Sequence, residues 1–138
     1  MATDLTGRTD ILMLWVDLTP TGRAALLAAF PPVHERKIAD HMTVAFKPTP
    51  AELASFVPGM RVSLIVTGYA EDEKGQAVLV EGYPSRNAFP HITVSVSQDT
   101  KPVYSNQLME AGYEELDGSV VLEGVTVAVT KRQEKILS

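Results

Sequence analysis

Cysteine is absent from the 138-residue sequence, which excludes disulfide bonds, thiolate nucleophiles and cysteine-based zinc sites. Basic residues are also scarce, because 12 Lys and Arg stand against 17 Asp and Glu and give a net charge of −5. Such a chain attracts a long polyanion weakly, although a single phosphate group or one nucleic-acid end remains within its reach. No apolar run approaches the roughly 20 residues of a membrane-spanning helix. We therefore expect neither duplex DNA nor a membrane among its partners.

The length and the 45% hydrophobic content are typical of one globular domain with a substantial core. No low-complexity linker or break in composition divides the chain. We predict a single domain over residues 1–138, with an ordered core over about residues 10–130 and polar tails. Residues 1–7 lack the basic start and the apolar stretch of a secretory signal peptide, so we expect a cytoplasmic protein.

The hydrophobic pattern predicts a mixture of strands and helices, with more strand than helix. Apolar and β-branched runs predict six strands, over residues 11–18, 39–47, 61–69, 76–81, 89–97 and 119–130. Helix propensity and capping residues predict three helices, over residues 21–30, 49–56 and 102–112. This order indicates the α+β class. Because each half of the chain contributes strands and a helix, we infer two small lobes related by a pseudo-twofold axis.

Two of the three histidines begin the same four-residue pattern, His41-Met42-Thr43-Val44 and His91-Ile92-Thr93-Val94. Each copy lies in a predicted strand, where successive side chains point to opposite faces. The histidine and the threonine of each copy therefore share one face, and the two apolar residues share the other. The same parity places Lys47 on the histidine face of the first strand. The repeated pattern predicts that two imidazoles and two hydroxyls meet in one cleft.

A pair of imidazoles suits phosphoester chemistry near neutral pH, because one ring can act as a base while the other acts as an acid. A threonine hydroxyl on the same face can donate a hydrogen bond to a phosphate oxygen. This chemistry requires no metal and no other cofactor. Two other interpretations stay open: each histidine can be a hydrogen-bonded residue of a half-buried strand, or a metal ligand. The metal interpretation needs an additional carboxylate, because no His-x-x-x-His pattern is present.

Three segments carry a resemblance to a known family: Asp40-His-Met-Thr-Val-Ala-Phe46, Phe89-Pro-His-Ile-Thr-Val-Ser95 and Lys101-Pro-Val-Tyr-Ser-Asn106. They resemble the 2H phosphoesterase superfamily, and are most similar to the cyclic phosphodiesterase domain of fungal and plant tRNA ligases and to related viral and bacterial "Swiss army knife" RNA-repair proteins. The resemblance extends over residues 11–129. It implies a bilobal fold, with two antiparallel β-sheets around a central cleft and helices packed outside.

The resemblance also implies an activity. The expected protein is a metal-independent phosphodiesterase that hydrolyses a cyclic phosphodiester, either an RNA 2′,3′-cyclic phosphate end or a cyclic (oligo)nucleotide, in RNA repair or counter-defence. The alternatives are a 2′-5′ RNA ligase or esterase of the same superfamily, and a non-catalytic module that binds a nucleotide or an RNA end. The substrate would be a small nucleotide or an RNA end. A viral protein of this kind would act in the host cytoplasm.

The resemblance assigns roles to the four motif residues. His41 and His91 would be the catalytic acid and base, with His91 activating water and His41 protonating the leaving oxygen. Thr43 and Thr93 would bind the phosphate. The third histidine, His34, has no threonine partner, so we expect it to be structural or exposed.

Six more residues are candidates for substrate binding. They are Lys47, Arg86, Tyr83, Tyr104, Ser105 and Trp15. The basic residues among them suit a phosphate or a ribose, and the aromatic ones suit stacking on a base. Each also has a structural interpretation, as a strand-end charge, a packing aromatic residue or a helix cap.

Overall fold

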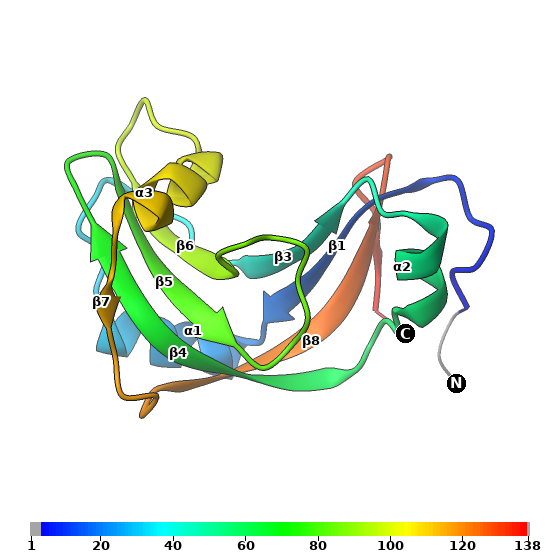
Figure 1. The fold of residues 1–138 in the computed structure, drawn as a ribbon, viewed down its shortest axis with the longest axis horizontal. Helices are drawn as coiled ribbons and strands as arrows, with labels where there is room; N and C mark the ends of the chain where they lie inside the picture. Colours follow the sequence, from blue (N-terminus) through cyan, green and yellow to red (C-terminus); the bar gives the residue numbers. More distant parts are fainter. Residues whose placement is uncertain (1–3, 138) are drawn as a thin grey trace.

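The computed structural model describes residues 4–137. Residues 1–3 and 138 lie outside it. The prediction that residues 1–7 are not a signal peptide therefore falls partly outside the described residues. The described chain contains these elements in order (Figure 1): β1 (Ile11–Leu18), α1 (Pro20–Ala29), β2 (Arg36–Lys37), β3 (His41–Phe46), α2 (Pro50–Ser55), β4 (Arg61–Glu71), β5 (Gly75–Glu81), β6 (His91–Val96), the 3₁₀ helix η1 (Pro102–Tyr104), α3 (Ser105–Ala111), β7 (Glu114–Glu115), β8 (Val121–Thr130) and β9 (Lys135–Ile136). None of these helices is long and apolar enough to cross a membrane.

The strands form one antiparallel sheet, in the order β7-β4-β5-β6-β3-β1-β8-β9, with β2 paired to β6. The long strand β4 pairs with β8 along its first half and with β5 along its second half. The sheet therefore closes on itself through β4, β5, β6, β3, β1 and β8 (Figure 1). A fold made mostly of one antiparallel sheet with a few helices agrees with the predicted α+β class. The expected division into two separate sheets is not found, because β4 is long enough to belong to both halves.

The first two helices begin where the sequence places a threonine before a proline. Thr19 caps α1 by accepting a hydrogen bond from the backbone N–H of Gly22 at 3.1 Å. Thr49 and Glu52 form a reciprocal capping box at the start of α2. Gly22 also lets α1 approach β8, because a Cβ at this position would lie 2.0 Å from the carbonyl oxygen of Glu123. Capping and close backbone approach thus fix the helix that covers the core.

The two-residue strands β2, β7 and β9 are too short to produce a hydrophobic pattern in the sequence. β9 lies where the sequence predicts only a polar tail, and it pairs with β8 through Val129↔Lys135 and Ala128↔Ile136. The Nζ of Lys135 also donates to Asp17 Oδ2 at 2.9 Å. The end of the described chain is thereby attached to β1.

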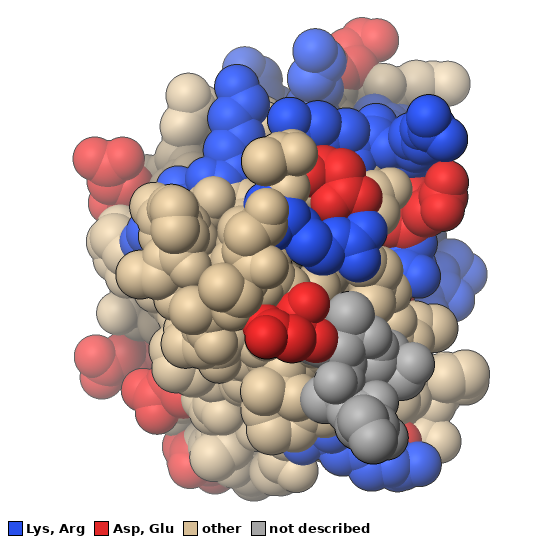
Figure 2. Space-filling view, turned by 90° about the vertical axis from the view of Figure 1, so that its right-hand side faces the viewer, with Lys and Arg blue, Asp and Glu red and all other residues tan. Residues whose placement is uncertain are grey.

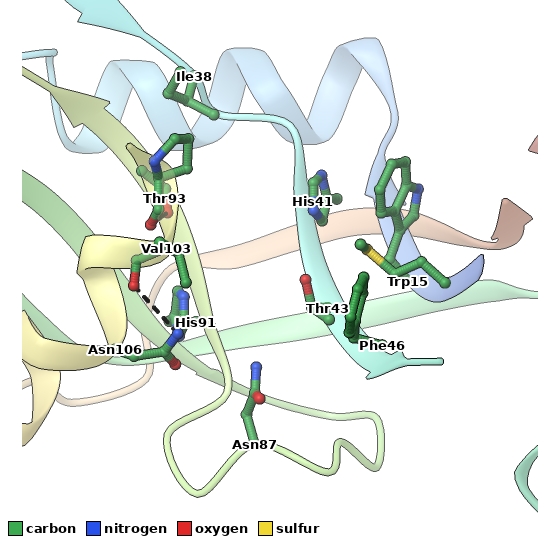
Figure 3. Close-up of a pocket in the computed structure, with 12 residues that line it drawn as sticks. Trp15, Ile38, His41, Thr43, Phe46, Asn87, His91, Thr93, Val103 and Asn106 are labelled. Atoms are coloured by element: carbon green, nitrogen blue, oxygen red, sulfur yellow. Dashed lines mark hydrogen bonds between the residues drawn. The ribbon is translucent and has the colours of Figure 1, made fainter. Parts of the chain in front are cut away.

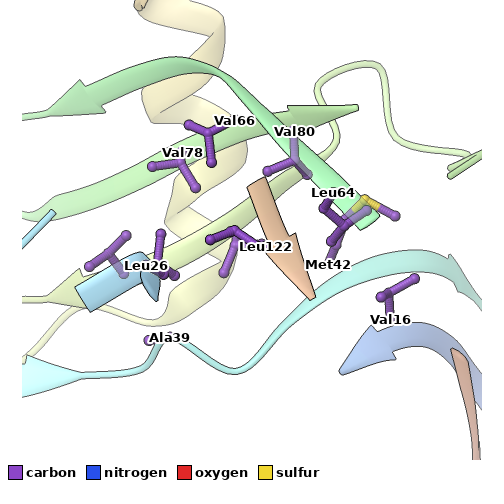
Figure 4. Packing of buried hydrophobic residues seen from close by; sticks show 11 residues of the cluster. Val16, Leu26, Ala39, Met42, Leu64, Val66, Val78, Val80 and Leu122 are labelled. Carbon is purple, nitrogen blue, oxygen red and sulfur yellow. The ribbon is translucent and has the colours of Figure 1, made fainter. Parts of the chain in front are cut away.

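The main hydrophobic core lies inside the closed sheet and includes a residue from each of its six strands. Figure 4 shows this cluster, which consists of Val16, Leu26, Ala39, Met42, Leu64, Val66, Val78, Val80, Ile92, Val94 and Leu122. Met42 and Ile92 form the pair that joins β3 to β6, and both side chains are fully buried. The apolar half of each repeated motif therefore belongs to the core.

Candidate active site

The two motif strands place their histidines and threonines in one cavity. Because Met42 and Ile92 point into the core, the residues on either side of them point the other way. His41 and Thr43 from β3, and His91 and Thr93 from β6, all line a cavity of about 500 Å³. In Figure 3 the β3 pair and the β6 pair lie on opposite sides of this cavity. The structure thus brings together the four residues that the repeated pattern singles out.

The alternation of side chains on β3 breaks immediately after Thr43. The pairing of β3 with β1 skips Val44, which forms a β-bulge. The bulge shifts the parity by one residue, so Ala45 is buried in a second apolar cluster and Phe46 lines the cavity. Lys47, which strict alternation would place on the histidine face, therefore lies outside this cavity.

The His91 ring is held by a hydrogen bond to the backbone. Its Nδ1 lies 2.7 Å from the carbonyl oxygen of Phe89. Because a carbonyl can only accept, Nδ1 carries the proton, and the neutral ring leaves Nε2 as an acceptor. Burial lowers the pKa of His91, while the bond to Phe89 opposes this shift. His91 is therefore neutral at pH 7 and has a free basic nitrogen.

His41 has a different environment. Its ring stacks on Trp15, with 3.8 Å between the ring centroids and an angle of 19° between the planes. Burial lowers the pKa of His41, and the nearby carboxylates of Asp17 and Asp40 oppose this shift. An aromatic face also favours a cation that stacks on it. Trp15 and the two carboxylates thus reduce the cost of protonating His41.

The two threonine hydroxyls differ in their partners. Thr93 is 6% exposed, and its Oγ1 donates to the carbonyl oxygen of Pro102 at 3.2 Å and lies 2.7 Å from Ser105 Oγ. Thr43 Oγ1 forms no hydrogen bond within residues 4–137, so its proton is available to a ligand. Ser105 is fully buried and contacts Thr93 rather than the cavity. The Thr93 hydroxyl is fixed in position, and the Thr43 hydroxyl is free to bind.

The rest of the cavity wall is mainly apolar. Besides the four motif residues, it is lined by Met13, Trp15, Ile38, Phe46, Asn87, Pro102, Val103 and Asn106, with no Lys or Arg among the described residues. Asn106 Nδ2 donates a hydrogen bond to the carbonyl oxygen of Val103 at 3.2 Å (Figure 3). The side-chain oxygen of Asn106 takes no part in that bond. The sequence did not predict that Asn87 and Phe46 line the cavity. Asn87 lies in a loop, which has no periodic pattern, and Phe46 follows the bulge at Val44, which interrupts the alternation.

Arg86 forms an ion pair away from the cavity. Its Nη2 and Nε bind the two carboxylate oxygens of Glu52 at 2.6 and 3.1 Å. The hydrogen bonds from Arg86 and from the backbone of Thr49 lower the pKa of Glu52 to about 2. The ion pair of Arg86 therefore links the loop before β6 to α2.

Two predicted stacking residues also lie elsewhere. Tyr83 contacts Phe56 edge to face, with 6.2 Å between the centroids, and both line a separate cavity of about 420 Å³. The Tyr104 hydroxyl donates a hydrogen bond to the Asp72 carboxylate, which links η1 to the turn between β4 and β5. Of the six additional candidates, Trp15 is the one that lines the cavity with the motif residues.

The third histidine is structural, as expected. His34 Nε2 donates to the carbonyl oxygen of Asp72 at 2.8 Å. Within residues 4–137 there is no group of three His, Cys, Asp or Glu side chains that could hold a metal ion. The residues that line the cavity carry two imidazoles, two hydroxyls, two amides and the indole N–H of Trp15 as their polar side-chain groups.

Two histidine-led strands that face one cavity are the arrangement expected of a 2H phosphoesterase. The sequence matches the family described as the fungal tRNA ligase phosphodiesterase domain over residues 34–136, which is most of the chain and includes both motifs. The chain belongs to this family of phosphodiesterase domains, which are of the 2H phosphoesterase type. Searches of curated proteins and of solved structures gave no match.

Proposed function

We propose that this protein is a metal-independent phosphodiesterase that hydrolyses a cyclic phosphodiester, either an RNA 2′,3′-cyclic phosphate end or a cyclic (oligo)nucleotide. The observation that carries the proposal is the convergence of His41, His91 and Thr43 on one cavity. The two halves of the closed sheet would act as lobes that flank this cleft. Their motif strands are joined by the single pair Met42↔Ile92, which leaves the polar faces open to a ligand.

In the proposed reaction His91 is the base. Its Nε2 removes a proton from a water molecule, which attacks phosphorus and opens the cyclic ester. The bond from Nδ1 to the Phe89 carbonyl supports this role, because it sets the tautomer with Nε2 unprotonated and fixes the ring plane. The positive charge that develops on His91 is also stabilised by that carbonyl.

His41 is the proposed acid. It protonates the ribose oxygen that leaves phosphorus, which yields a phosphomonoester and a free hydroxyl. Its stacking on Trp15 and the nearby carboxylates of Asp17 and Asp40 favour the protonated ring. A bound phosphodiester adds a negative charge and favours it further.

The cavity wall supports a substrate of low charge. The described lining contains no Lys or Arg, so a single phosphodiester anion is bound by hydrogen bonds and by His41 in its protonated form. The apolar side chains of Met13, Phe46 and Val103 offer a wall for a nucleobase or ribose. A small nucleotide or the end of an RNA strand fits this chemistry. A role in RNA repair or counter-defence, in the cytoplasm, is the corresponding biological proposal.

The pH dependence follows from the lowered pKa values of both histidines. His91 must be neutral and His41 must be protonated, and in the free protein burial holds the pKa of each below the ordinary 6.5. We expect kcat/KM to reach its maximum below about pH 6.5 and to fall at higher pH as His41 loses its proton. The fall in kcat should occur at higher pH, because the bound anion raises the pKa of His41. Profiles from about pH 5 to about pH 9 test this, and a kcat/KM that still rises above about pH 7.5 would contradict it.

The free hydroxyl of Thr43 predicts a loss of activity without a loss of stability. Thr43→Val keeps the shape of the side chain and removes the donor, so kcat/KM should fall about 10²-fold, the usual effect of losing one transition-state hydrogen bond. Thr43→Ser should retain most of the activity. Thr93→Val, unlike Thr43→Val, should lower the free energy of unfolding by about 1–3 kcal/mol, because Ser105 loses a buried hydrogen-bond partner. Wild-type kcat/KM in Thr43→Val would show that this hydroxyl does not bind the phosphate.

The proposal is tested with a panel of substrates in the presence of EDTA. The panel contains 2′,3′-cyclic mononucleotides, RNA with a cyclic phosphate end, 2′-5′ and 3′-5′ cyclic dinucleotides and cyclic trinucleotides, with products identified by mass. A ring-opened phosphomonoester or a linearised oligonucleotide is expected. Joined RNA strands, or cleavage of linear 2′-5′ linkages alone, would instead indicate a ligase or esterase. Binding without turnover of any substrate would indicate a non-catalytic module.

A further inference from the structure

Three basic side chains share a further cavity, separate from the catalytic one and from the one that Tyr83 lines. Arg8, Lys47 and Lys131 line a cavity of about 390 Å³. Arg8 precedes β1, Lys47 follows β3 and Lys131 follows β8. Figure 2 shows that Lys and Arg side chains gather over the upper part of the face at the right of Figure 1, with Asp and Glu between them. A local excess of positive charge is notable in a chain whose net charge is −5.

The three cations are only partly neutralised. Arg8 binds both carboxylate oxygens of Asp10, at 2.9 and 2.6 Å. Lys47 and Lys131 form no salt bridge with any other described residue. Like charges in one cavity repel each other, and an anion bound among them removes that repulsion. The ligand chemistry of this cavity is therefore anionic.

The basic cavity begins where one wall of the catalytic cavity ends. Met13 of β1 pairs with Phe46 of β3, and both line the catalytic cavity. The next residues, Leu12 and Lys47, line the basic cavity and are joined by a hydrogen bond of 2.7 Å from Lys47 N to the Leu12 carbonyl. Lys47 adopts a left-handed backbone conformation with φ of 51°, and its Nζ lies 5.4 Å from the centroid of the Phe46 ring. A strand that leaves the catalytic cavity over Phe46 meets the Lys47 ammonium group first.

We propose that Arg8, Lys47 and Lys131 form a subsite for a backbone phosphate of the RNA strand whose cyclic end occupies the catalytic cavity. This inference rests on the proposed function and names its substrate class, an oligonucleotide end rather than a free cyclic mononucleotide. Because the described wall of the catalytic cavity has no Lys or Arg, further phosphates of the strand need cations outside it. The basic cavity supplies them one residue beyond that wall.

Another cavity provides a matched comparison. It measures about 660 Å³, contains Lys74 and Lys101, and shares Val103 and Asn106 with the catalytic cavity. It has one basic residue fewer, and Asp99 also lines it. An RNA strand that left the catalytic cavity over α3 would depend on Lys74 and Lys101, whereas one that left over Phe46 would depend on Lys47 and Lys131. Removing each pair of lysines therefore distinguishes the two paths.

The kinetic test compares two double variants, Lys47→Met/Lys131→Met and Lys74→Met/Lys101→Met. For each protein, kcat/KM is measured with 2′,3′-cyclic AMP and with an RNA of about six nucleotides that ends in a 2′,3′-cyclic phosphate. The first variant should lower the ratio of RNA to mononucleotide kcat/KM about 10-fold, because the bound phosphate loses two of its three cations. The second variant should keep the wild-type ratio. An unchanged ratio in the first variant, or a fall in the second variant alone, would overturn the subsite.

A binding measurement decides the question even if neither substrate is cleaved. The affinity for the same RNA, labelled at its 5′ end, is measured by fluorescence anisotropy at increasing salt concentration. Removing Lys47 and Lys131 should reduce the slope of log affinity against log salt by about 0.7, the value for one neutralised phosphate of a single strand. An equal slope in wild type and variant would refute the subsite. Absence of turnover by wild type, with the predicted change in slope, would refute the proposed activity and leave the subsite supported.

Discussion

Replacing His91 or His41 by alanine is expected to lower kcat by about two to four orders of magnitude, the usual contribution of a positioned base or acid. His91→Ala removes the nitrogen that activates water, and His41→Ala removes the proton donor for the leaving oxygen. The measurement is steady-state turnover of the substrate that the panel identifies, with circular dichroism to verify folding. Both side chains are only half buried, so their removal leaves the core intact.

The controls for this prediction come from the same chain. His34→Gln alters a histidine that lies outside the cavity and should keep kcat within a few fold of wild type. The His41→Ala/His91→Ala double variant should be little slower than the slower single variant, because an acid and a base that act together do not contribute additively. A folded single variant with wild-type kcat on every substrate would remove that histidine from the mechanism.

Met42→Ala is expected to lower the free energy of unfolding by about 2–5 kcal/mol, the usual cost of truncating a large buried side chain. Met42 is fully buried, and its pairing with Ile92 is what joins the two motif strands. Because His41 is its direct neighbour, the variant should also lose turnover under conditions in which it is still folded. Denaturation by urea measures the first effect, and kcat at low temperature measures the second.

Two substitutions serve as controls for Met42→Ala. Met42→Leu conserves the volume of the side chain and should cost less than about 1.5 kcal/mol. Val33→Ala truncates a side chain that is 49% exposed and should change the free energy of unfolding by less than about 0.5 kcal/mol. If Met42→Ala cost no more than Val33→Ala, the pair Met42↔Ile92 would not be the structural link between the motif strands.

Regular periodicity accounts for what the sequence could predict. The alternation around His41 and His91 predicted that Met42 and Ile92 are buried and that both histidines line the cavity, because a strand has a period of two. The capping residues predicted the start of α2 at Thr49, whereas for α1 they left Thr19 and Thr21 open, and the structure has Thr19 as the cap. These signals are local and depend on few neighbours.

Long-range contacts account for what the sequence could not predict. The bulge at Val44 arises from the pairing of β3 with β1, so simple alternation placed Lys47 in the cavity instead of Phe46. The ion pair of Arg86 with Glu52 joins residues 34 positions apart, and no local pattern reveals it. Closure of the sheet depends on which strands β4 meets, and this is decided by tertiary packing.

The most direct test of the central claim uses one substrate, two proteins and H₂¹⁸O. Wild type and the His41→Ala/His91→Ala variant are incubated in excess EDTA with the cyclic phosphodiester that the panel identifies. Wild type should open the ring and place one ¹⁸O atom on the product phosphate, while the double variant should form product at least about 10²-fold more slowly. Equal product formation by the two proteins, or loss of wild-type turnover in EDTA, would contradict metal-independent hydrolysis by this pair of histidines.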